Sequence, residues 1–301
     1  MEKEAAENYI LAGKITKRAV EKAKKSIKPG QKLIEIALDI EKSIIDIGEG
    51  KANPAFPVNL SINENAAHFT PRTGCKQVLE ESDVLKVDLG SHVEGFICDT
   101  AFTLNFDNSH AKMIEAAEQA LENALSIAVE KAEIGKIGAE IEKTIKGRGF
   151  NPIQNLSGHG LAEFEQHAFP SIPNIGTGNT RKLEEGNAYA IEPFATDGQG
   201  IVREGQRSEI FALEKPKALR NTYARRVLEV VLEEYQALPF AGRWIEKKLK
   251  MPEFQRKVAM IELVRNGIIK EFLVLHEEPG KFVAQAEKSF IIREGKTIVL
   301  C

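Results

Sequence analysis

The stretch KVDLGSHVEGFICDTAF, residues 86–102, holds two short apolar runs on either side of a glycine-flanked reversal. Runs of this length and composition, interrupted by turn residues, are typical of a β-hairpin. With Val93-Glu94 as the two-residue loop, Asp88 would lie directly opposite Asp99. Both side chains would then point to the same face of the sheet, because successive residues of a strand alternate between its faces.

Two aspartates paired across a hairpin have their Cβ atoms only about 4.5–5.5 Å apart. In apolar surroundings such carboxylates repel each other and must be protonated or neutralised by cations. Bound metal is one answer. The alternative is that one aspartate belongs to the turn and the other faces solvent, and a register shift of one residue would also separate them.

Composition is that of an ordinary globular protein with one large or two smaller domains. The 301 residues are 43% hydrophobic and 28% charged, with a formal net charge of -3. That balance favours neither wholesale nucleic-acid binding nor an acidic tail. Three cysteines without paired spacing argue against a disulfide framework or a zinc ribbon. With no signal-peptide pattern and no membrane span expected, we predict a cytoplasmic protein.

Apolar spacing of three and four predicts helices along much of the chain. Proline and glycine separate them from strand-prone runs. The expected helices cover 4–26, 33–47, 110–130, 137–146, 223–237 and 253–266, and the expected strands after the hairpin cover 187–194, 208–213 and 290–300.

Two segments of the chain resemble each other. SIKPGQKLIEIALDIEKSIIDIG, from Ser26, and KAEIGKIGAEIEKTIKGRG, from Lys131, share a break, an amphipathic helix with an Ile-Glu-Lys core, and a glycine stop. NPAFPVNLSI and NPIQNLSGHG follow, from Asn53 and Asn151. We therefore predict an α+β fold with two related halves, about 1–107 and 108–301. A ligand cleft would lie between them.

Residues 215–281 differ in character from the rest of the second half. They are rich in Arg, Lys and Glu at helical spacing, with Pro239, Gly242 and Pro252 as breaks. We interpret them as a helical insert. Its basic residues could mark a contact surface, although a solvated helical face explains them as well.

Three further stretches each place a residue that could bind a metal near the end of a strand or loop. They are His159 in SGHG, Glu192 in YAIEPF and Glu287 in VAQAEKSFII. Taken singly, each also reads as an ordinary loop or edge residue. With Asp88 and Asp99 they form an oxygen-rich set with one imidazole, which suits Mn, Fe, Co or Zn. Bridging carboxylates would support two ions about 3.5–4 Å apart.

These five residues, in this order and spacing, resemble the pita-bread metallopeptidases, and among them the type II methionine aminopeptidases. The resemblance covers essentially the whole chain. NENAAHFTP, before the first aspartate, and LPFAGRW, within the insert, are also similar to type II segments. The resemblance implies a single pita-bread catalytic domain over 1–301, of the short archaeal form, with the insert at 215–281.

The resemblance also implies residue roles. Asp88, Asp99, His159, Glu192 and Glu287 would hold two divalent ions, Co, Mn, Fe or Zn, and a metal-bound hydroxide would attack the carbonyl of an initiator methionine. Glu192 would shuttle the proton. His68 would contact the scissile amide, His167 would stabilise the tetrahedral intermediate, and Phe56 would line the methionine pocket. These substrate contacts complete the expected site.

The chain departs from the type II pattern at two places. Lys288 and Ser289 follow the last glutamate where histidine and threonine are typical, and Phe169 replaces a glycine after His167. An ammonium beside a ligand could change metal affinity, unless strand alternation turns it to the opposite face. We expect Phe169 to narrow the substrate entrance.

Two alternatives stay open. A proline-specific pita-bread peptidase shares the five ligands, but it normally carries an additional N-terminal domain and lacks this insert. A catalytically silent homologue that binds ribosomes or nucleic acid usually loses ligands. The expected partners are nascent polypeptide N-termini, association with the ribosome is left open, and a monomer is expected.

Overall fold

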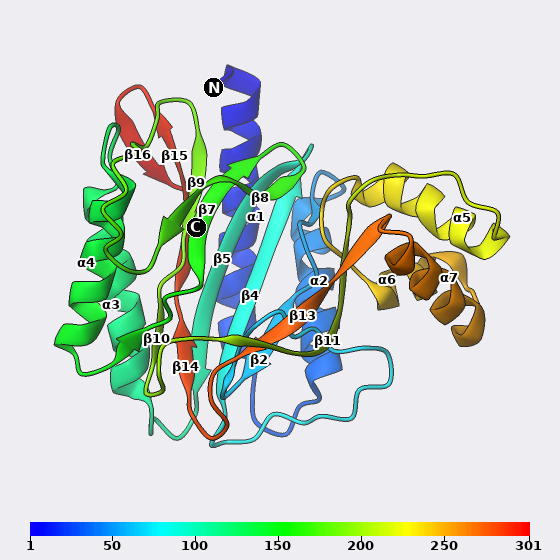
Figure 1. Cartoon of the computed structure of the whole chain (residues 1–301), viewed down its shortest axis with the longest axis horizontal. Helices are drawn as coiled ribbons and strands as arrows, with labels where there is room; N and C mark the ends of the chain where they lie inside the picture. Colours follow the sequence, from blue (N-terminus) through cyan, green and yellow to red (C-terminus); the bar gives the residue numbers. More distant parts are fainter.

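The computed structural model describes all 301 residues and has an α+β architecture around one large, strongly curved sheet (Figure 1). The central strand order is β1-β4-β5-β15-β9-β7-β8, with β2 pairing β4 and β16 pairing β15. The strands of this sheet are β1 (Asn53–Pro54), β2 (Asn59–Ile62), β4 (Val84–Val93), β5 (Phe96–Asn105), β7 (Ser157–Ala162), β8 (Glu165–Pro173), β9 (Ala188–Ile191), β15 (Glu287–Arg293) and β16 (Lys296–Val299).

Four helices cover one face of the sheet. They are α1 (Lys3–Ser26), α2 (Leu33–Gly48), α3 (Ala111–Ile127) and α4 (Ile134–Gly147). Two large apolar clusters seal this layer, one under the α1 and α2 pair and one under the α3 and α4 pair. In Figure 1 the blue α1 runs behind β4 and β5, and the green α3 and α4 lie side by side. These helices leave the opposite face of the sheet uncovered.

The two halves are pseudo-symmetric about the junction of β5 and β15. On one side the order is β2-β4-β5, and on the other it is β7-β9-β15. The two similar segments of the sequence match this arrangement. β1 and β6 (Asn151–Pro152) start with the same Asn-Pro pair, and the residues just before α2 and α4, Lys32 and Glu133, each make an isolated bridge, to Val78 and Lys182.

The hairpin forms as predicted, but the predicted register is wrong. The loop is Glu94-Gly95, so Asp88 pairs with Ala101 and Asp99 pairs with Gly90. Both loop residues have positive φ, 50° and 84°. A two-residue hairpin turn of this kind fits the right-handed twist of its strands. The shift is two residues, so both aspartates still share one face, as diagonal neighbours.

Several predicted boundaries were also wrong. The strand expected over 290–300 is a second hairpin, β15 and β16, with Glu294 at positive φ in its turn. The strand expected over 187–194 breaks at Glu192-Pro193 into β9 and β10 (Phe194–Thr196), and β11 (Arg203–Leu213) starts earlier than expected. β10 lies in a small separate sheet with β6 and β14 (Val283–Gln285).

The region expected as a helical insert contains both helices and strands. Its helices are α5 (Thr222–Val230), continued by the π-helix η1 (Val231–Tyr235), α6 (Gly242–Leu249) and α7 (Glu253–Arg265). They share an apolar cluster of their own. The strand β13 (Ile269–His276), which was not predicted, pairs with β11 and with β3 (Asn65–Ala67), and β12 (Phe240–Ala241) pairs with the far side of β11.

A buried ion pair fastens this insert to the first half. Arg243 on α6 contacts the Glu41 carboxylate on α2, and both side chains are less than a tenth exposed. Trp244 Nε1 donates to the other Glu41 oxygen at 3.0 Å, and Arg243 also donates to the Thr70 hydroxyl at 2.8 Å. Most donors and acceptors of the pair are thus satisfied inside the protein. No helix of the chain has the length and apolar character that crossing a membrane requires.

We predict that Arg243→Leu lowers the free energy of unfolding by about 3–5 kcal/mol, because it leaves the Glu41 carboxylate buried without its partner. Chemical denaturation measures the change. The double variant with Glu41→Leu should cost clearly less than the sum of the two single variants. Equal stability of Arg243→Leu and the native chain would contradict a structural role for this pair.

Candidate active site

One cavity of about 250 Å³ gathers every residue that the sequence placed in the site. It lies on the sheet face that the four helices leave open. Its walls come from both halves and from the β11 to β13 region: Phe56, Asn59, Ala67, His68, Asp88, Asp99, Asn155, Leu156, Ser157, His159, Gln166, His167, Glu192, Phe194, Ile210, Pro239, Phe272 and Glu287.

Strand register explains how the acidic residues meet. Ala101 on β5 has Asp88 opposite it on β4 and Glu287 opposite it on β15. Asp99 is two residues away on β5, so all four side chains share one face. Ala101 is the smallest of the four, and its methyl group leaves space between the three carboxylates.

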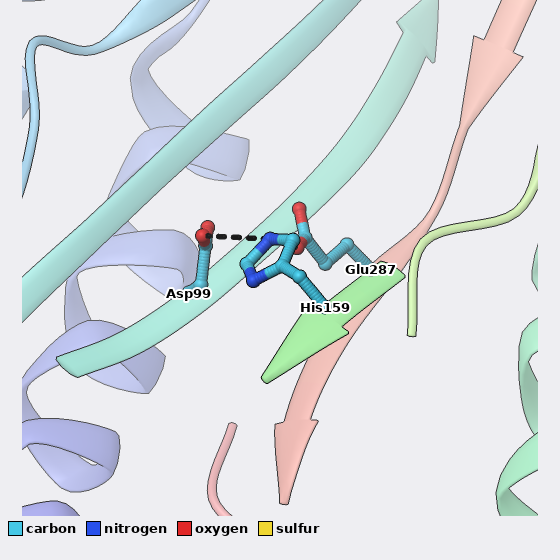
Figure 2. A group of neighbouring side chains, drawn as sticks. All are labelled: Asp99, His159 and Glu287. Carbon is cyan, nitrogen blue, oxygen red and sulfur yellow. Dashed lines mark ion pairs between the residues drawn. The ribbon is translucent and has the colours of Figure 1, made fainter. Parts of the chain in front are cut away.

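His159 approaches this group from β7. Its Nδ1 lies 3.1 Å from the Gly160 carbonyl, to which it must donate, so Nε2 carries the lone pair. That Nε2 is 3.8 Å from Asp99 Oδ2, 3.9 Å from Glu287 Oε1 and 4.0 Å from Glu192 Oε1. These separations are too long for hydrogen bonds. Asp99, His159 and Glu287, shown in Figure 2, each offer a ligand atom within 4.8 Å of the others.

The buried carboxyl groups must either hold protons or be neutralised by cations. Burial raises the pKa of Asp99 to about 7, and burial with repulsion from neighbouring carboxylates raises the pKa of Asp88, Glu192 and Glu287 well above their ordinary values. Asp88 Oδ1, Asp99 Oδ1 and Glu287 Oε1 are buried without a hydrogen-bond partner. Oxygen-rich ligands with one neutral imidazole fit divalent transition metals.

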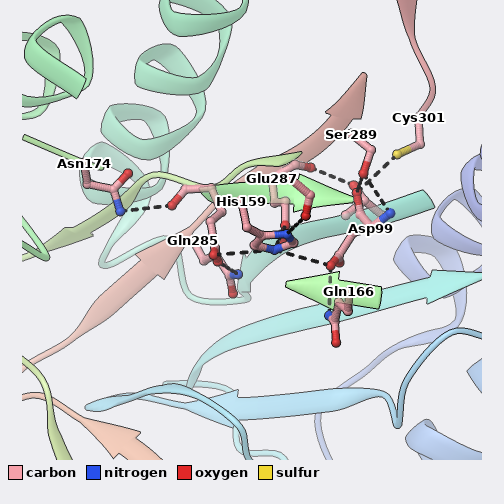
Figure 3. Close-up of polar contacts among 11 residues, drawn as sticks. Asp99, His159, Gln166, Asn174, Gln285, Glu287, Ser289 and Cys301 are labelled. Carbon is pink, nitrogen blue, oxygen red and sulfur yellow. Dashed lines mark hydrogen bonds and ion pairs between the residues drawn. The ribbon is translucent and has the colours of Figure 1, made fainter. Parts of the chain in front are cut away.

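Several neighbours that orient the candidate ligand residues were not predicted. Gln166 Nε2 donates to Asp99 Oδ2 at 2.9 Å, and Gln285 Nε2 donates to Glu192 Oε2 at 3.3 Å (Figure 3). The Ser289 hydroxyl accepts from the Asp99 N–H at 2.8 Å and donates to the Asp99 carbonyl at 2.7 Å. The buried Asn174 Nδ2 donates to the Glu192 carbonyl at 3.2 Å. Metal ligands are commonly held by such outer partners.

Among these neighbours, Gln166 is the one whose burial follows the alternation of its strand. Gln166 is buried on β8 while Glu165 and His167 beside it are exposed. A buried glutamine between polar residues indicates a fixed hydrogen bond, but the sequence does not indicate its partner. Asp99 is 67 residues away along the chain.

Two more histidines border the acidic group. His68, at φ 66°, places Nδ1 3.1 Å from the Leu273 carbonyl on β13, and its ring stands edge-on to Phe272. Burial lowers the pKa of His68 to about 4, so the ring is neutral and its Nε2 is an acceptor. His167 lies edge-on to His159, with ring centroids 4.6 Å apart.

The rest of the cavity is largely apolar. Phe56 is 2% exposed and packs against Gly90, where a Cβ atom would come within 2.6 Å of the Phe56 ring. Gly90 is the cross-strand partner of Asp99. The absence of a side chain at Gly90 therefore brings the aromatic wall next to the acidic group. Ile210, Pro239 and Phe272 supply the wall on the insert side.

Of the residues that depart from the type II pattern, Lys288 and Phe169 lie away from the cavity, whereas the Ser289 hydroxyl bonds the backbone of Asp99. The Lys288 ammonium points to the helix-covered face and pairs with Glu122 on α3 at 2.6 Å. Phe169 is 71% exposed, stacks on the Arg181 guanidinium at 4.2 Å, and does not line the cavity. The expectation that Phe169 narrows the entrance is therefore wrong for this cavity.

Comparison with known proteins agrees with this geometry. The model of metallopeptidase family M24 matches residues 7–220. The methionine aminopeptidase of Thermococcus onnurineus is 46% identical over 294 residues, which cover 97% of this chain and 98% of that protein.

Solved structures share the fold. A thermophilic Arx1 superposes with a TM-score of 0.88 at 19% identity, covering 100% of this chain and 91% of that chain. Methionine aminopeptidase from Thermotoga maritima superposes with a TM-score of 0.70 at 22% identity, covering 100% and 97%. The full-length match, the pita-bread architecture and the buried Asp, His and Glu cluster lead to one conclusion: this chain is a member of metallopeptidase family M24, similar over its whole length to the short archaeal methionine aminopeptidases.

Proposed function

We propose that the chain is a metal-dependent aminopeptidase that removes the N-terminal methionine from nascent polypeptides. One observation supports this proposal most strongly. In a single small cavity, a cluster of buried carboxylates that could bind cations lies beside apolar side chains, among them Phe56, Ile210 and Phe272. The cluster supplies hydrolytic chemistry and the recess suits an unbranched, polarisable side chain such as methionine, whose sulfur packs well against aromatic rings.

The proposed metal site comprises Asp88, Asp99, His159, Glu192 and Glu287. Three of them, Asp99, His159 and Glu287, are close enough to share one divalent ion. Asp88, Asp99 and Glu287 would serve both ions, and His159 and Glu192, whose Nε2 and Oε1 lie 4.0 Å apart, would complete one of the two positions. Bound divalent ions of the Mn, Fe, Co or Zn class would lower the pKa of a water molecule and polarise the substrate carbonyl.

Glu192 is the proposed proton carrier. In the metal-free protein, burial and the nearby Asp88 and Asp99 charges raise the pKa of Glu192. Its Oε2 is fixed by Gln285, while Oε1 faces the acidic group. A carboxyl group placed in this way can take a proton at one stage and return it to the leaving amine at another.

The two histidines are assigned to substrate contacts. With Nδ1–H committed to Leu273, His68 presents an acceptor at Nε2, which suits a peptide N–H of the substrate. His167, on the other side of His159, is the proposed donor to the oxygen on which charge develops. Phe56 is the proposed aromatic wall for the methionine side chain.

A proline-specific peptidase and a catalytically silent homologue remain alternatives, and one peptide-hydrolysis assay separates them from the proposal. Purified protein, metal-stripped and then titrated with Mn²⁺, is given Met-Ala-Ser and an Xaa-Pro peptide side by side. Methionine release that needs metal supports the proposal, release from the Xaa-Pro peptide alone supports the first alternative, and no release supports the second. A monomeric state and a cytoplasmic location stay predictions.

Asp99→Asn should reduce methionine release by more than about 10²-fold, a larger loss than the roughly 10–100-fold effects of changing an outer partner of a metal ligand. The amide keeps the shape of the side chain but removes its charge. Hydrolysis of Met-Ala-Ser at saturating Mn²⁺ measures the loss. Glu122→Gln, a matched change on the helix-covered face, should retain activity, and an active Asp99→Asn enzyme would contradict the ligand assignment.

Removing metal should make stability depend on pH. Below about pH 6.5 the lowered pKa values of the buried His68, His92 and His159 oppose the raised pKa values of the carboxylates. Between about pH 6.5 and pH 8 these histidines are neutral in both states, so the raised carboxylate pKa values mean that the folded metal-free protein binds more protons than the unfolded chain. Stability should therefore fall as pH rises through this window. Mn²⁺ at 100 times its dissociation constant should restore about 2.7 kcal/mol. Thermal melts at about pH 6.5 and pH 8 with and without Mn²⁺ test this, and equal melting temperatures with and without metal would contradict it.

His167→Ala should lower kcat by about 10²–10³-fold, as loss of an oxyanion donor does, with little change in KM. Metal content measured on the same sample is the control, since a donor to the substrate should leave metal binding intact. A variant that loses metal together with activity would instead place His167 among the groups that hold the ions.

A further inference from the structure

Two cysteines meet on the back of the strand that carries Asp99. Cys98 on β5 is fully buried, and its Sγ lies 2.7 Å from the Sγ of the partly exposed Cys301. Cys98 precedes Asp99, so strand alternation turns its side chain toward α1 and away from the cavity. The pair is therefore separate from the proposed active site. The third cysteine, Cys75, lines a groove beside β11 and α7.

The surrounding structure holds both sulfurs in place. Cys98 pairs across the hairpin with Ser91, whose hydroxyl contacts Thr16 Oγ1 on α1 at 2.8 Å. On the other side, the buried Leu300 donates its N–H to the Ser289 carbonyl at 2.9 Å. Leu300 also packs against α1 at Gly13, where a Cβ atom would come within 2.4 Å of its carbonyl oxygen. The segment that bears Cys301 has little room to move away from Cys98.

We propose that Cys98 and Cys301 are a disulfide-forming pair that fastens the segment after β16 to the back of β5. Two free thiol sulfurs at 2.7 Å need only a small approach to reach the 2.03–2.05 Å of a disulfide bond. The spacing of the cysteines in the sequence gives no sign of this pair, because 203 positions separate them.

A low-molecular-weight disulfide is the oxidant that balances the reaction. The partly exposed Cys301 thiolate attacks one sulfur of that disulfide, forming a mixed disulfide and releasing one small thiol. The Cys98 thiolate then attacks the Cys301 sulfur and releases the second small thiol. Two protein thiols are oxidised, one small disulfide is reduced, and the protons pass to the two released thiols.

The link should stabilise the sheet beside the ligands. A cross-link that closes a long loop restricts the unfolded chain more than one that closes a short loop. Cys301 also donates its S–H to the Asp99 carbonyl, at 3.6 Å, and oxidation removes this donor. The same carbonyl keeps its bond from Ser289 at 2.7 Å, so Asp99 should stay in position and methionine release at ordinary temperature should not change.

The test uses the full-length, Mn²⁺-loaded protein, reduced or treated with oxidised glutathione. Peptide mapping should find a cross-link between the peptides that contain Cys98 and Cys301, with one protein chain per band on a non-reducing gel. The melting temperature of the oxidised form should exceed that of the reduced form by about 4–10 °C. Cys75→Ser should keep this shift.

Cys301→Ser is the main variant, because its position is partly exposed and the change leaves the core intact. It should abolish both the cross-link and the shift in melting temperature while the reduced form melts as before. Equal alkylation of Cys98 and Cys301 before and after oxidation would overturn the proposal. So would a cross-link that forms only through Cys75, or one that leaves the melting temperature unchanged.

Discussion

Carboxylates buried together can ionise only if cations share their space, and this constraint organises the centre of the molecule. The sheet places Asp88, Ala101 and Glu287 in a row across three strands, with Asp99 beside them. Folding such a group costs free energy, because charged groups lose water without gaining partners. The apolar layer beneath the four helices must offset that cost. The register of the strands is therefore as important to the site as the identity of the carboxylate residues.

Much of the fold could be predicted because its signals are local. Helical spacing located the helix pairs of both halves, and the apolar runs located the hairpin. The register was mispredicted by two residues because Val93-Glu94 was taken as the loop. A turn with positive φ at both positions disfavours a β-branched valine, whereas Glu94-Gly95 can adopt it at lower cost. Since side chains alternate with a period of two, the error left both aspartates on the correct face.

What the sequence did not predict depends on contacts between distant segments. The bond from Gln166 to Asp99, the pair of Arg243 with Glu41 and the pairing of β13 with β11 each join residues that lie far apart along the chain. β13 lies in a stretch whose charges made it look like a helical surface. The eight residues expected at the site do meet in one cavity, although their individual roles rest on the resemblance and stay predictions until tested.

The small size of that cavity limits which polypeptides can reach the carboxylates. At about 250 Å³ it is smaller than the roughly 300–1,000 Å³ of sites that enclose drug-sized ligands. Phe56, Ile210 and Pro239 take part of the space around the carboxylates. An extended chain end with one side chain suits this volume. A folded domain is too large to enter a space of this volume, so its size alone favours substrates with an extended, accessible end.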